Sequence, residues 1–295
     1  MTKRAVIAAV NDYSQQNSLP SGWHVSTLHK CVADALSFGD LLTTGYGFEQ
    51  PTFLTDQATT RDAIVQAVQD MLVASGAGDV ATLFFSGHGG RFPADTANPN
   101  RYYESLIPAS GRPITDLDLF KLADSLDQST VNFTIILDSC FSGGLHEGTP
   151  DFRSATYTSD FVQTCVSTMD TIIPCGVTLE PGSSALDGNV SNVSGQGNGV
   201  VCSVDDNKSL VPLSKSTVVA ACRYDETAAE LNAHGALTQG LLDLLSQSNP
   251  SLTYLDLIDQ LRSDMQTLQV TQTPTLLGQQ NRASESFLAP WIASK

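Results

Sequence analysis

Short, continuous apolar runs alternate with amphipathic segments of helical spacing along the first half of this chain. The runs expected to form strands are Arg4–Val10, Val80–Phe85 and Val131–Leu137. The segments expected to form helices are Thr27–Leu42, Thr59–Val73 and Thr115–Leu126, the second opened by a Thr59-x-x-Asp62 cap. Strands without polar alternation are buried on both faces, and strands separated by helices pair in parallel. The pattern therefore predicts an α/β fold, a mostly parallel central sheet with helices on both faces.

The alternation stops at residue 148 and resumes at residue 216. Within the gap, residues 181–199 contain five glycines and no Lys or Arg, a composition typical of flexible segments. A buried strand is then expected at Thr217–Cys222, followed by helices at Ala236–Ser246 and Leu252–Leu268. We therefore expect one interrupted domain, with its first part at 1–147, an insertion at 148–215 and its second part at 216–295.

The charge of the chain limits its partners. With 15 basic and 31 acidic residues the formal net charge is −16, which argues against nucleic acid or an anionic membrane as the main partner. The first apolar run ends at Asn11-Asp12, too short for a signal peptide, and no window approaches the roughly 18 apolar residues of a membrane span. We therefore expect a cytoplasmic protein whose six cysteines are reduced thiols, with no Cys-x-x-Cys pair for zinc.

Two of the predicted strands run into residues that could carry chemistry. Leu83-Phe-Phe-Ser-Gly-His88-Gly-Gly90 ends in a histidine among glycines, and Thr134-Ile-Ile-Leu-Asp-Ser-Cys140 ends in a cysteine followed by small residues. The carboxyl ends of parallel strands share one edge of a sheet, where ligands and reactive groups collect. We expect both side chains to emerge at that edge, with glycine amides nearby free to donate hydrogen bonds.

A histidine beside a cysteine suits nucleophilic catalysis. A thiol is only a few per cent thiolate at neutral pH, so a neighbouring imidazole that takes its proton makes it more reactive. His88 and Cys140 are 52 residues apart, and caspases carry their catalytic His roughly 50 residues before the Cys. Taken singly, such residues are more often a turn histidine and an inert core thiol; together, in these contexts, they favour catalysis.

The chain resembles the caspase-like cysteine peptidases, specifically their metacaspase and orthocaspase branch. The resemblance rests on Phe84–Gly90 and Asp138–Gly143, with support from Val10–Tyr13, Cys31–Ala35, Ala220–Ala228, His234–Thr238 and Thr273–Gly278. It implies a caspase-like fold and a cysteine endopeptidase that needs no cofactor for its chemistry. It also implies Cys140 as nucleophile, His88 as general base and acid, and the backbone N–H groups of Gly89 and Cys140 as oxyanion hole.

The resemblance also implies cleavage of protein substrates after Arg or Lys. In this branch the positions that match Asp34 and Asp138 form an acidic pocket, and this chain has an acid at both. Two converging carboxylates repel each other and suit a cation that can bridge them. Asp225 is a further candidate for the same cleft. The alternative is structural: a solvated helix residue at 34, a turn-capping acid at 138 and a helix cap at 225.

Calcium is left open by the sequence. Many members of this branch bind it through acids outside the active site, and Asp116, Asp118, Glu104 and Glu147 lie near the matching positions. Calcium requires six to eight oxygen ligands, and this set looks incomplete because Leu117 separates acids that are usually adjacent. The alternative is an ordinary acidic surface.

The insertion also allows two interpretations. It is either a tolerated surface loop or a regulatory segment whose cleavage, by the enzyme itself or by an upstream protease, activates a zymogen. Its three basic residues, Arg153, Lys208 and Lys215, are the candidate cleavage points.

Two other functions remain as alternatives to the metacaspase-like enzyme. One is a catalytically inactive caspase-like interaction module, which typically lacks the His or the Cys that this chain keeps. The other is an Arg-specific peptidase of the gingipain or clostripain type, against which the absence of a secretion signal argues. The resemblance further implies a monomer.

Overall fold

A computed structural model describes most of the domain predicted from the sequence. The described residues are 1–19, 23, 25–93, 102–126, 131–140, 215–223, 226–247, 252–278 and 282–291. Nearly all of the predicted insertion, together with Asp225, Glu147, Arg153 and Lys208, lies outside them. The division of the chain at 148 and 215 therefore stays a prediction.

The centre of the molecule is a six-stranded sheet in the order β2-β1-β3-β7-β8-β9. All pairings are parallel except that of β8 with β9. Strands β3, β7 and β8 are buried along their whole length, as expected for runs without polar alternation. The strands span Lys3–Ala9 (β1), Thr52–Thr55 (β2), Val80–Ser86 (β3), Asn132–Asp138 (β7), Thr217–Ala220 (β8) and Thr275–Gly278 (β9).

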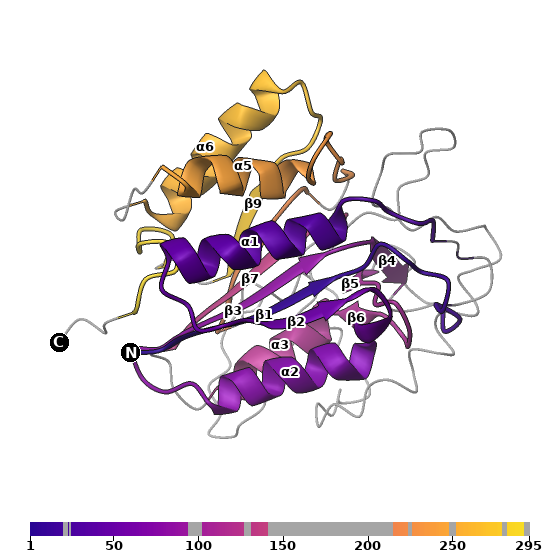
Figure 1. Cartoon of the computed structure of the whole chain (residues 1–295), viewed down its shortest axis with the longest axis horizontal. Coiled ribbons are helices and arrows are strands. Elements are labelled where there is room, and N and C mark those ends of the chain that lie inside the picture. Colours follow the sequence, from indigo (N-terminus) through magenta and orange to yellow (C-terminus); the bar gives the residue numbers. More distant parts are fainter. Residues whose placement is uncertain are drawn as a thin grey trace, which may run out of the picture.

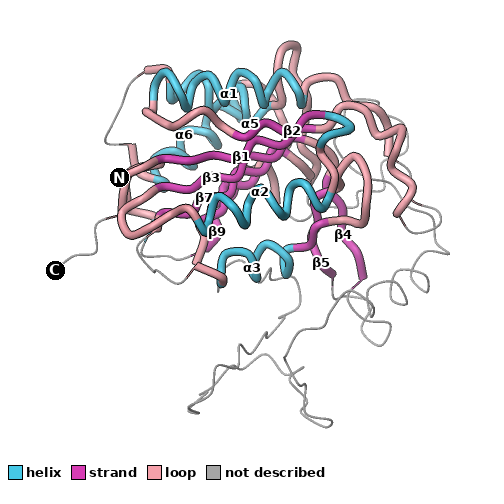
Figure 2. The backbone as a smooth tube through the Cα atoms, turned by 60° about the horizontal axis from the view of Figure 1, so that its bottom comes forward, coloured by secondary structure: helices cyan, strands magenta, loops and turns pink. Residues whose placement is uncertain are grey.

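Helices cover both faces of this sheet (Figure 1). α1, α5 and α6 pack on one face and α2 and α3 on the other, so the domain has three layers (Figure 2). The bounds are Cys31–Gly45 (α1), Arg61–Val73 (α2), Asp116–Asp124 (α3), Ala236–Leu245 (α5) and Tyr254–Thr267 (α6). Among the helices that the structure describes, none is long and apolar enough to cross a membrane.

A second, antiparallel sheet follows β3 at the carboxyl edge of the main sheet (Figure 1). It consists of β4 (Gly89–Pro93), β5 (Tyr102–Leu106) and β6 (Ile114–Thr115). β4 begins at Gly89, directly after the candidate histidine, and Gly89 pairs with Leu106. The histidine segment is therefore fixed between two sheets.

The α/β fold predicted from the sequence is confirmed, with two local corrections. The first predicted helix begins at Cys31 instead of Thr27, because residues 25–30 form an irregular segment. The cap of α2 is Thr60, whose side chain accepts a hydrogen bond from Ala63 N, and not Thr59. The hydroxyl of Thr59 instead donates to Ala9 O, at the end of the buried strand β1. It is therefore not the cap that the sequence pattern predicted.

Tyr254 connects helix α6 to the central sheet. It is fully buried, and its hydroxyl bonds Thr134 Oγ1 and donates to Asn132 Oδ1 at 3.2 Å, both on β7. The same hydroxyl accepts from Leu288 N at 3.4 Å. Burial raises the pKa of this phenol, so it stays neutral and keeps its proton for donation.

Replacing Tyr254 by Phe should lower the free energy of unfolding by about 1–3 kcal/mol, because buried polar groups on β7 then lose their partner. Urea unfolding followed by circular dichroism measures the change. Tyr46, half-buried beyond the end of α1, is the matched control, and Tyr46→Phe should change stability by less than about 0.5 kcal/mol. Equal effects of the two substitutions would contradict the role given to the Tyr254 hydroxyl.

Candidate active site

The register of two parallel strands brings the candidate histidine and cysteine together. β3 and β7 pair residue for residue up to Ser86 and Asp138, and Gly87 N donates to Asp138 O at 3.3 Å. His88 and Cys140 each follow two residues after the last pair. Both therefore lie where the sequence predicted them, at the carboxyl edge of the same sheet.

Gly89 provides the close approach between the two segments. A Cβ atom built on Gly89 would lie 1.4 Å from Cys140 O and 2.6 Å from its carbonyl carbon. The backbones after β3 and β7 are thus in direct contact, and any side chain at residue 89 would separate them. Both His88 and Cys140 are buried beside this contact, each with 0% exposure.

The ring of His88 is oriented by a backbone carbonyl. Its Nε2 lies 2.7 Å from Ser26 O. A carbonyl oxygen only accepts, so Nε2 carries the hydrogen and donates it. The neutral ring then has Nδ1 as the nitrogen that can take a proton. Asn11 holds the Ser26 segment in place, because its carbonyl accepts from Leu28 N and its side-chain oxygen from Cys31 N, both at 2.9 Å.

Tyr13 fixes the backbone of the same histidine. Its hydroxyl accepts from His88 N at 2.7 Å and donates to Ile107 O at 3.2 Å, and the Tyr13 and His88 ring centroids are 4.8 Å apart. The chain leading from β1 to Tyr13 is in turn held by Asp56, whose Oδ1 accepts from Asn11 N at 2.7 Å and from Asp12 N at 3.0 Å. Asp56 adopts a positive φ of 47°, a region that Asp tolerates better than most residues.

The sulfur of Cys140 is held by the chain after β8. Ala228 N donates to Cys140 Sγ at 2.9 Å. Such an N–H donor orients the sulfur and becomes a stronger partner once the sulfur carries negative charge. The residues around 228 belong to the segment that follows β8, so both halves of the domain contribute to the site.

The two acids of the predicted pocket converge on the first turn of α5. Asp34 Oδ1 accepts from Gly235 N at 2.9 Å and from His234 Nδ1 at 3.0 Å, and its Oδ2 accepts from Ser86 Oγ at 2.7 Å. Asp138 Oδ2 accepts from Thr238 N at 3.0 Å and Thr238 Oγ1 at 2.6 Å. Both carboxylates are fully buried. The structure thus places both Asp34 and Asp138 against the start of α5, and the alternative of a solvated residue at 34 is wrong.

The residues considered for calcium do not form a metal site in the part of the chain that is described. Asp118 Oδ1 forms an ion pair with Arg61 at 3.1 Å. Its Oδ2 accepts hydrogen bonds from Thr115 N and Oγ1 in the cap of α3. No group of three or more His, Cys, Asp or Glu that could hold a metal occurs among the described residues, which include Glu104 and Asp116 but not Glu147. We derive no step through calcium.

Lys215 is the one candidate cleavage residue that the structure describes. Its Nζ donates to Asp124 O, in the last residue of α3, at 3.0 Å and to Leu126 O at 2.8 Å, and it lies 3.4 Å from Asp124 Oδ1. Cleavage after Lys215 would require the release of these bonds.

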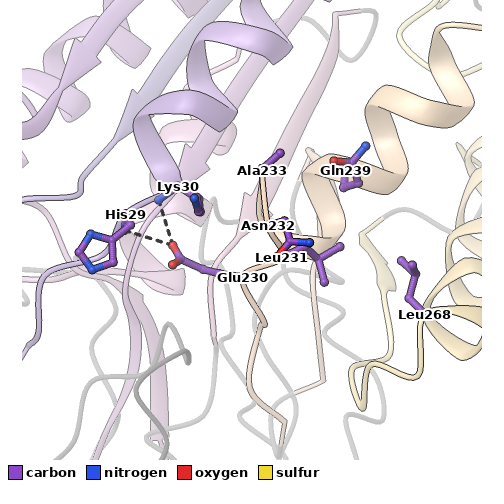
Figure 3. A pocket seen from close by; sticks show the side chains of 8 residues that line it. All are labelled: His29, Lys30, Glu230, Leu231, Asn232, Ala233, Gln239 and Leu268. Atoms are coloured by element: carbon purple, nitrogen blue, oxygen red, sulfur yellow. Dashed lines mark hydrogen bonds between the residues drawn. The ribbon is translucent and has the colours of Figure 1, made fainter.

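A cavity of about 690 Å³ lies beside the turn that leads into α5 (Figure 3). It is bordered by His29 and Lys30 before α1, by Glu230 and the turn 231–233, and by Gln239 and Leu268. Glu230 joins its two sides, because its carboxylate accepts from Lys30 N at 3.2 Å. Cys140 and His88 do not line this cavity.

Comparisons with known proteins agree with this architecture. The sequence profile described as "Caspase domain" matches residues 2–284. The chain belongs to the caspase-domain family of peptidases. Metacaspase-9 of Arabidopsis thaliana is 25% identical to it, with 89% of this chain and 92% of the relative covered. Metacaspase-4 of the same plant is 32% identical over 49% of this chain, and this match spans only 34% of that relative's length.

A crystal structure of a Geobacter sulfurreducens protein shows the same fold. The two superpose with a TM-score of 0.68 at 19% sequence identity, over 99% of this chain and 100% of the other. At that identity the likeness concerns the fold alone. Together with the family membership, it confirms the resemblance that the sequence motifs indicated.

Several residues of this caspase-domain site had no functional signal in the sequence. Ser26 and Ala228 act through backbone atoms, which any residue type supplies, so no side-chain pattern could have indicated them. Tyr13 and His234 belong to segments that resemble the family, but the sequence assigned no role to either residue. Ser86 had a usable signal, because a small polar residue at the end of a buried apolar strand points toward a polar partner.

Gly89→Ala should destabilise the domain by about 3 kcal/mol or more, because a methyl group would overlap the carbonyl of Cys140 and force the two segments apart. Gly76→Ala is the matched control, since a Cβ there meets nothing within 4 Å. That substitution should be neutral or stabilise by up to about 1 kcal/mol. Thermal unfolding of both variants measures the difference, and a stable Gly89→Ala protein would contradict the close approach.

Proposed function

We propose that this caspase-domain chain is a cysteine endopeptidase that cleaves proteins after Arg or Lys, with Cys140 as nucleophile and His88 as its base. The observation that carries the proposal is the in-register pairing of β3 and β7, closed by the contact of Gly89 with Cys140. It brings a histidine of fixed tautomer beside a cysteine at the edge of the sheet where ligands bind.

The chemistry follows from the hydrogen bonds of the two residues. Because Ser26 O takes the Nε2 hydrogen, Nδ1 of His88 accepts the thiol proton of Cys140. The thiolate attacks the scissile carbonyl carbon and forms a tetrahedral adduct. The imidazolium then returns the proton to the leaving amine as the C–N bond breaks. Water, deprotonated by the same nitrogen, hydrolyses the thioester and releases the acid product with the free thiol.

The developing oxyanion needs donors close to the sulfur. Gly89 and Cys140 supply backbone N–H groups on the two segments that meet there. We assign these two groups to the oxyanion hole, in line with the family resemblance. Such donors are fixed by the backbone contact before the substrate arrives, which is the arrangement that stabilises a transition state most effectively.

Specificity for a cation is supported by the buried acids. Asp34 and Asp138 both contact the first turn of α5. Two buried carboxylates near each other are stabilised by any positive group between them, and a guanidinium can bond both. Asp225 stays a candidate for the same pocket.

Burial of the reactive side chains supports activation by rearrangement. His88 and Cys140 each have 0% exposure, so a peptide reaches them only after surrounding groups move. Cleavage in the insertion is the activating event that we propose, at Arg153, Lys208 or Lys215.

Turnover of fluorogenic peptides tests the nucleophile and the specificity. The activated wild-type protein should cleave an Arg peptide at least about 30-fold more efficiently than the matched Asp peptide, because leaving a buried charge without its partner costs about 2–5 kcal/mol. Cys140→Ala should abolish cleavage. Cys222→Ala, the replacement of an equally buried thiol on the adjoining strand end, should leave it unchanged.

Each outcome of that experiment is informative. Equal turnover by the wild type and Cys140→Ala would end the nucleophile assignment, and preference for the Asp peptide would end the assignment of the acidic pocket. A chain that is processed in its insertion yet cleaves neither peptide and resists alkylation at Cys140 would be the inactive interaction module.

Tyr13→Phe should lower kcat about tenfold with little change in KM, because His88 N loses its acceptor and the imidazole loses its fixed position. Steady-state kinetics below the unfolding temperature measure the split between kcat and KM. Alkylation of Cys140 by iodoacetamide should slow in parallel, which a general loss of stability would not cause. Tyr46→Phe serves again as the control. An unchanged kcat would show that Tyr13 only packs.

A further inference from the structure

The carboxylate of Asp34 is already covered in the substrate-free chain. Its donors include Ser86 Oγ, Gly235 N and His234 Nδ1, at 2.7, 2.9 and 3.0 Å. Ser86 ends β3, and Gly235 N precedes the first turn of α5, so both are fixed by secondary structure. The third donor, the imidazole of His234, lies where a substrate cation that bonds Asp34 would have to bind.

His234 differs from the other two donors in its freedom to move. Its side chain is 15% exposed, whereas that of Asp34 is 0% exposed. It occupies the end of a turn whose tip, Asn232 and Ala233, is exposed. The turn is closed by Leu231 N donating to His234 O at 2.7 Å and by a bridge between Glu230 and Gly235. Both turn contacts are made by backbone atoms, so moving the ring does not break them.

We propose that His234 is a displaceable occupant of the acidic pocket, which the Arg or Lys side chain of a substrate must remove from Asp34 in order to bind. The inference rests on the proposed Arg/Lys specificity and adds a specificity-determining residue to it. The imidazole bonds Asp34 through Nδ1, whereas a guanidinium has five N–H donors in a planar fork and can bond two carboxylates at once. A substrate guanidinium gains both Asp34 and Asp138 when it replaces the ring.

Open space lies next to the turn that carries His234. The cavity of about 690 Å³ is bordered by Glu230 and by residues 231–233, directly before His234 (Figure 3). Gln239 and Leu268 line the same cavity. Movement of the His234 ring from Asp34 toward this neighbouring space is the displacement that the proposal requires.

Occupation of the pocket by His234 raises the apparent dissociation constant of a cationic substrate. If the covered state is about ten times more populated than the open state, the apparent dissociation constant for a cationic substrate is about tenfold higher than for the open pocket. Neutral or small ligands that do not bond Asp34 bind without displacing His234, so the occupant does not raise their dissociation constants. The occupant thus makes the enzyme reject weakly bound side chains and admit those that can form two ion pairs.

Removing the occupant tests the proposal directly. His234→Ala should lower the KM for an Arg peptide about tenfold and leave kcat within about twofold of wild type. Labelling of Cys140 by an Arg chloromethylketone should accelerate by a similar factor, while labelling by iodoacetamide should not change. His29→Ala replaces a histidine that lines the same cavity and whose backbone N donates to Glu230, and should behave as wild type.

An unchanged or raised KM in His234→Ala would overturn the proposal, because the ring would then be neutral to binding or would hold Asp34 in place for the substrate. The wild-type protein separates this failure from failure of the proposed function. If it prefers Arg over Asp peptides and His234→Ala does not lower KM, only the occupant is disproved. If it shows no preference for Arg, the acidic pocket itself is disproved.

Should His234→Ala fail to fold, the same question can be put to an intact pocket. Cys140→Ala protein with ¹⁵N-labelled histidine, cut in its insertion by the activated wild-type enzyme, is titrated with acetyl-arginine amide, and the Nδ1 resonance of His234 is followed. The proposal expects this resonance to lose its hydrogen-bonded shift at saturation, and the resonance of His29 to stay in place. Retention of the His234 shift in the saturated complex would overturn the proposal.

Discussion

The parallel, in-register pairing of β3 with β7 is the constraint on which the rest of the site depends. It fixes Ser86 opposite Asp138 and places His88 and Cys140 at equal distances beyond that pair. Because Gly89 then touches the carbonyl of Cys140, the two reactive segments cannot slide past each other. A one-residue slip of either strand would turn one of the reactive side chains away from the other.

The first turn of α5 is the second organising element. Its backbone donors, with the hydroxyl of Thr238, bond two buried carboxylates from different elements: Asp34 from α1 and Asp138 from β7. The positive end of a helix offsets part of the cost of burying such charges. The same contacts join the residues before the insertion to those after it, so one electrostatic cluster holds the domain together and borders the reactive cysteine.

The parts of this structure that could be predicted from the sequence are those with a local signal. Continuous apolar runs marked β1, β3, β7 and β8. The glycines around His88 indicated free amide donors, but not the contact of Gly89 with the Cys140 carbonyl. β9 gave no signal of its direction, because antiparallel pairing at a sheet edge depends on where the chain returns. Ser26 was beyond reach for another reason: it contributes a carbonyl, and its position depends on Asn11, 15 residues earlier.

Asp34 and Asp138 show why residue type alone could not decide between a structural and a recognition role. Each satisfies backbone and side-chain donors of the fold and lies where a substrate cation would be bound. Replacing either acid therefore removes a structural contact together with a proposed ligand contact, and a loss of activity would not separate the two. His234 is the residue at which they separate, since its bond to Asp34 can be removed while Ser86 and Gly235 still hold the carboxylate in place.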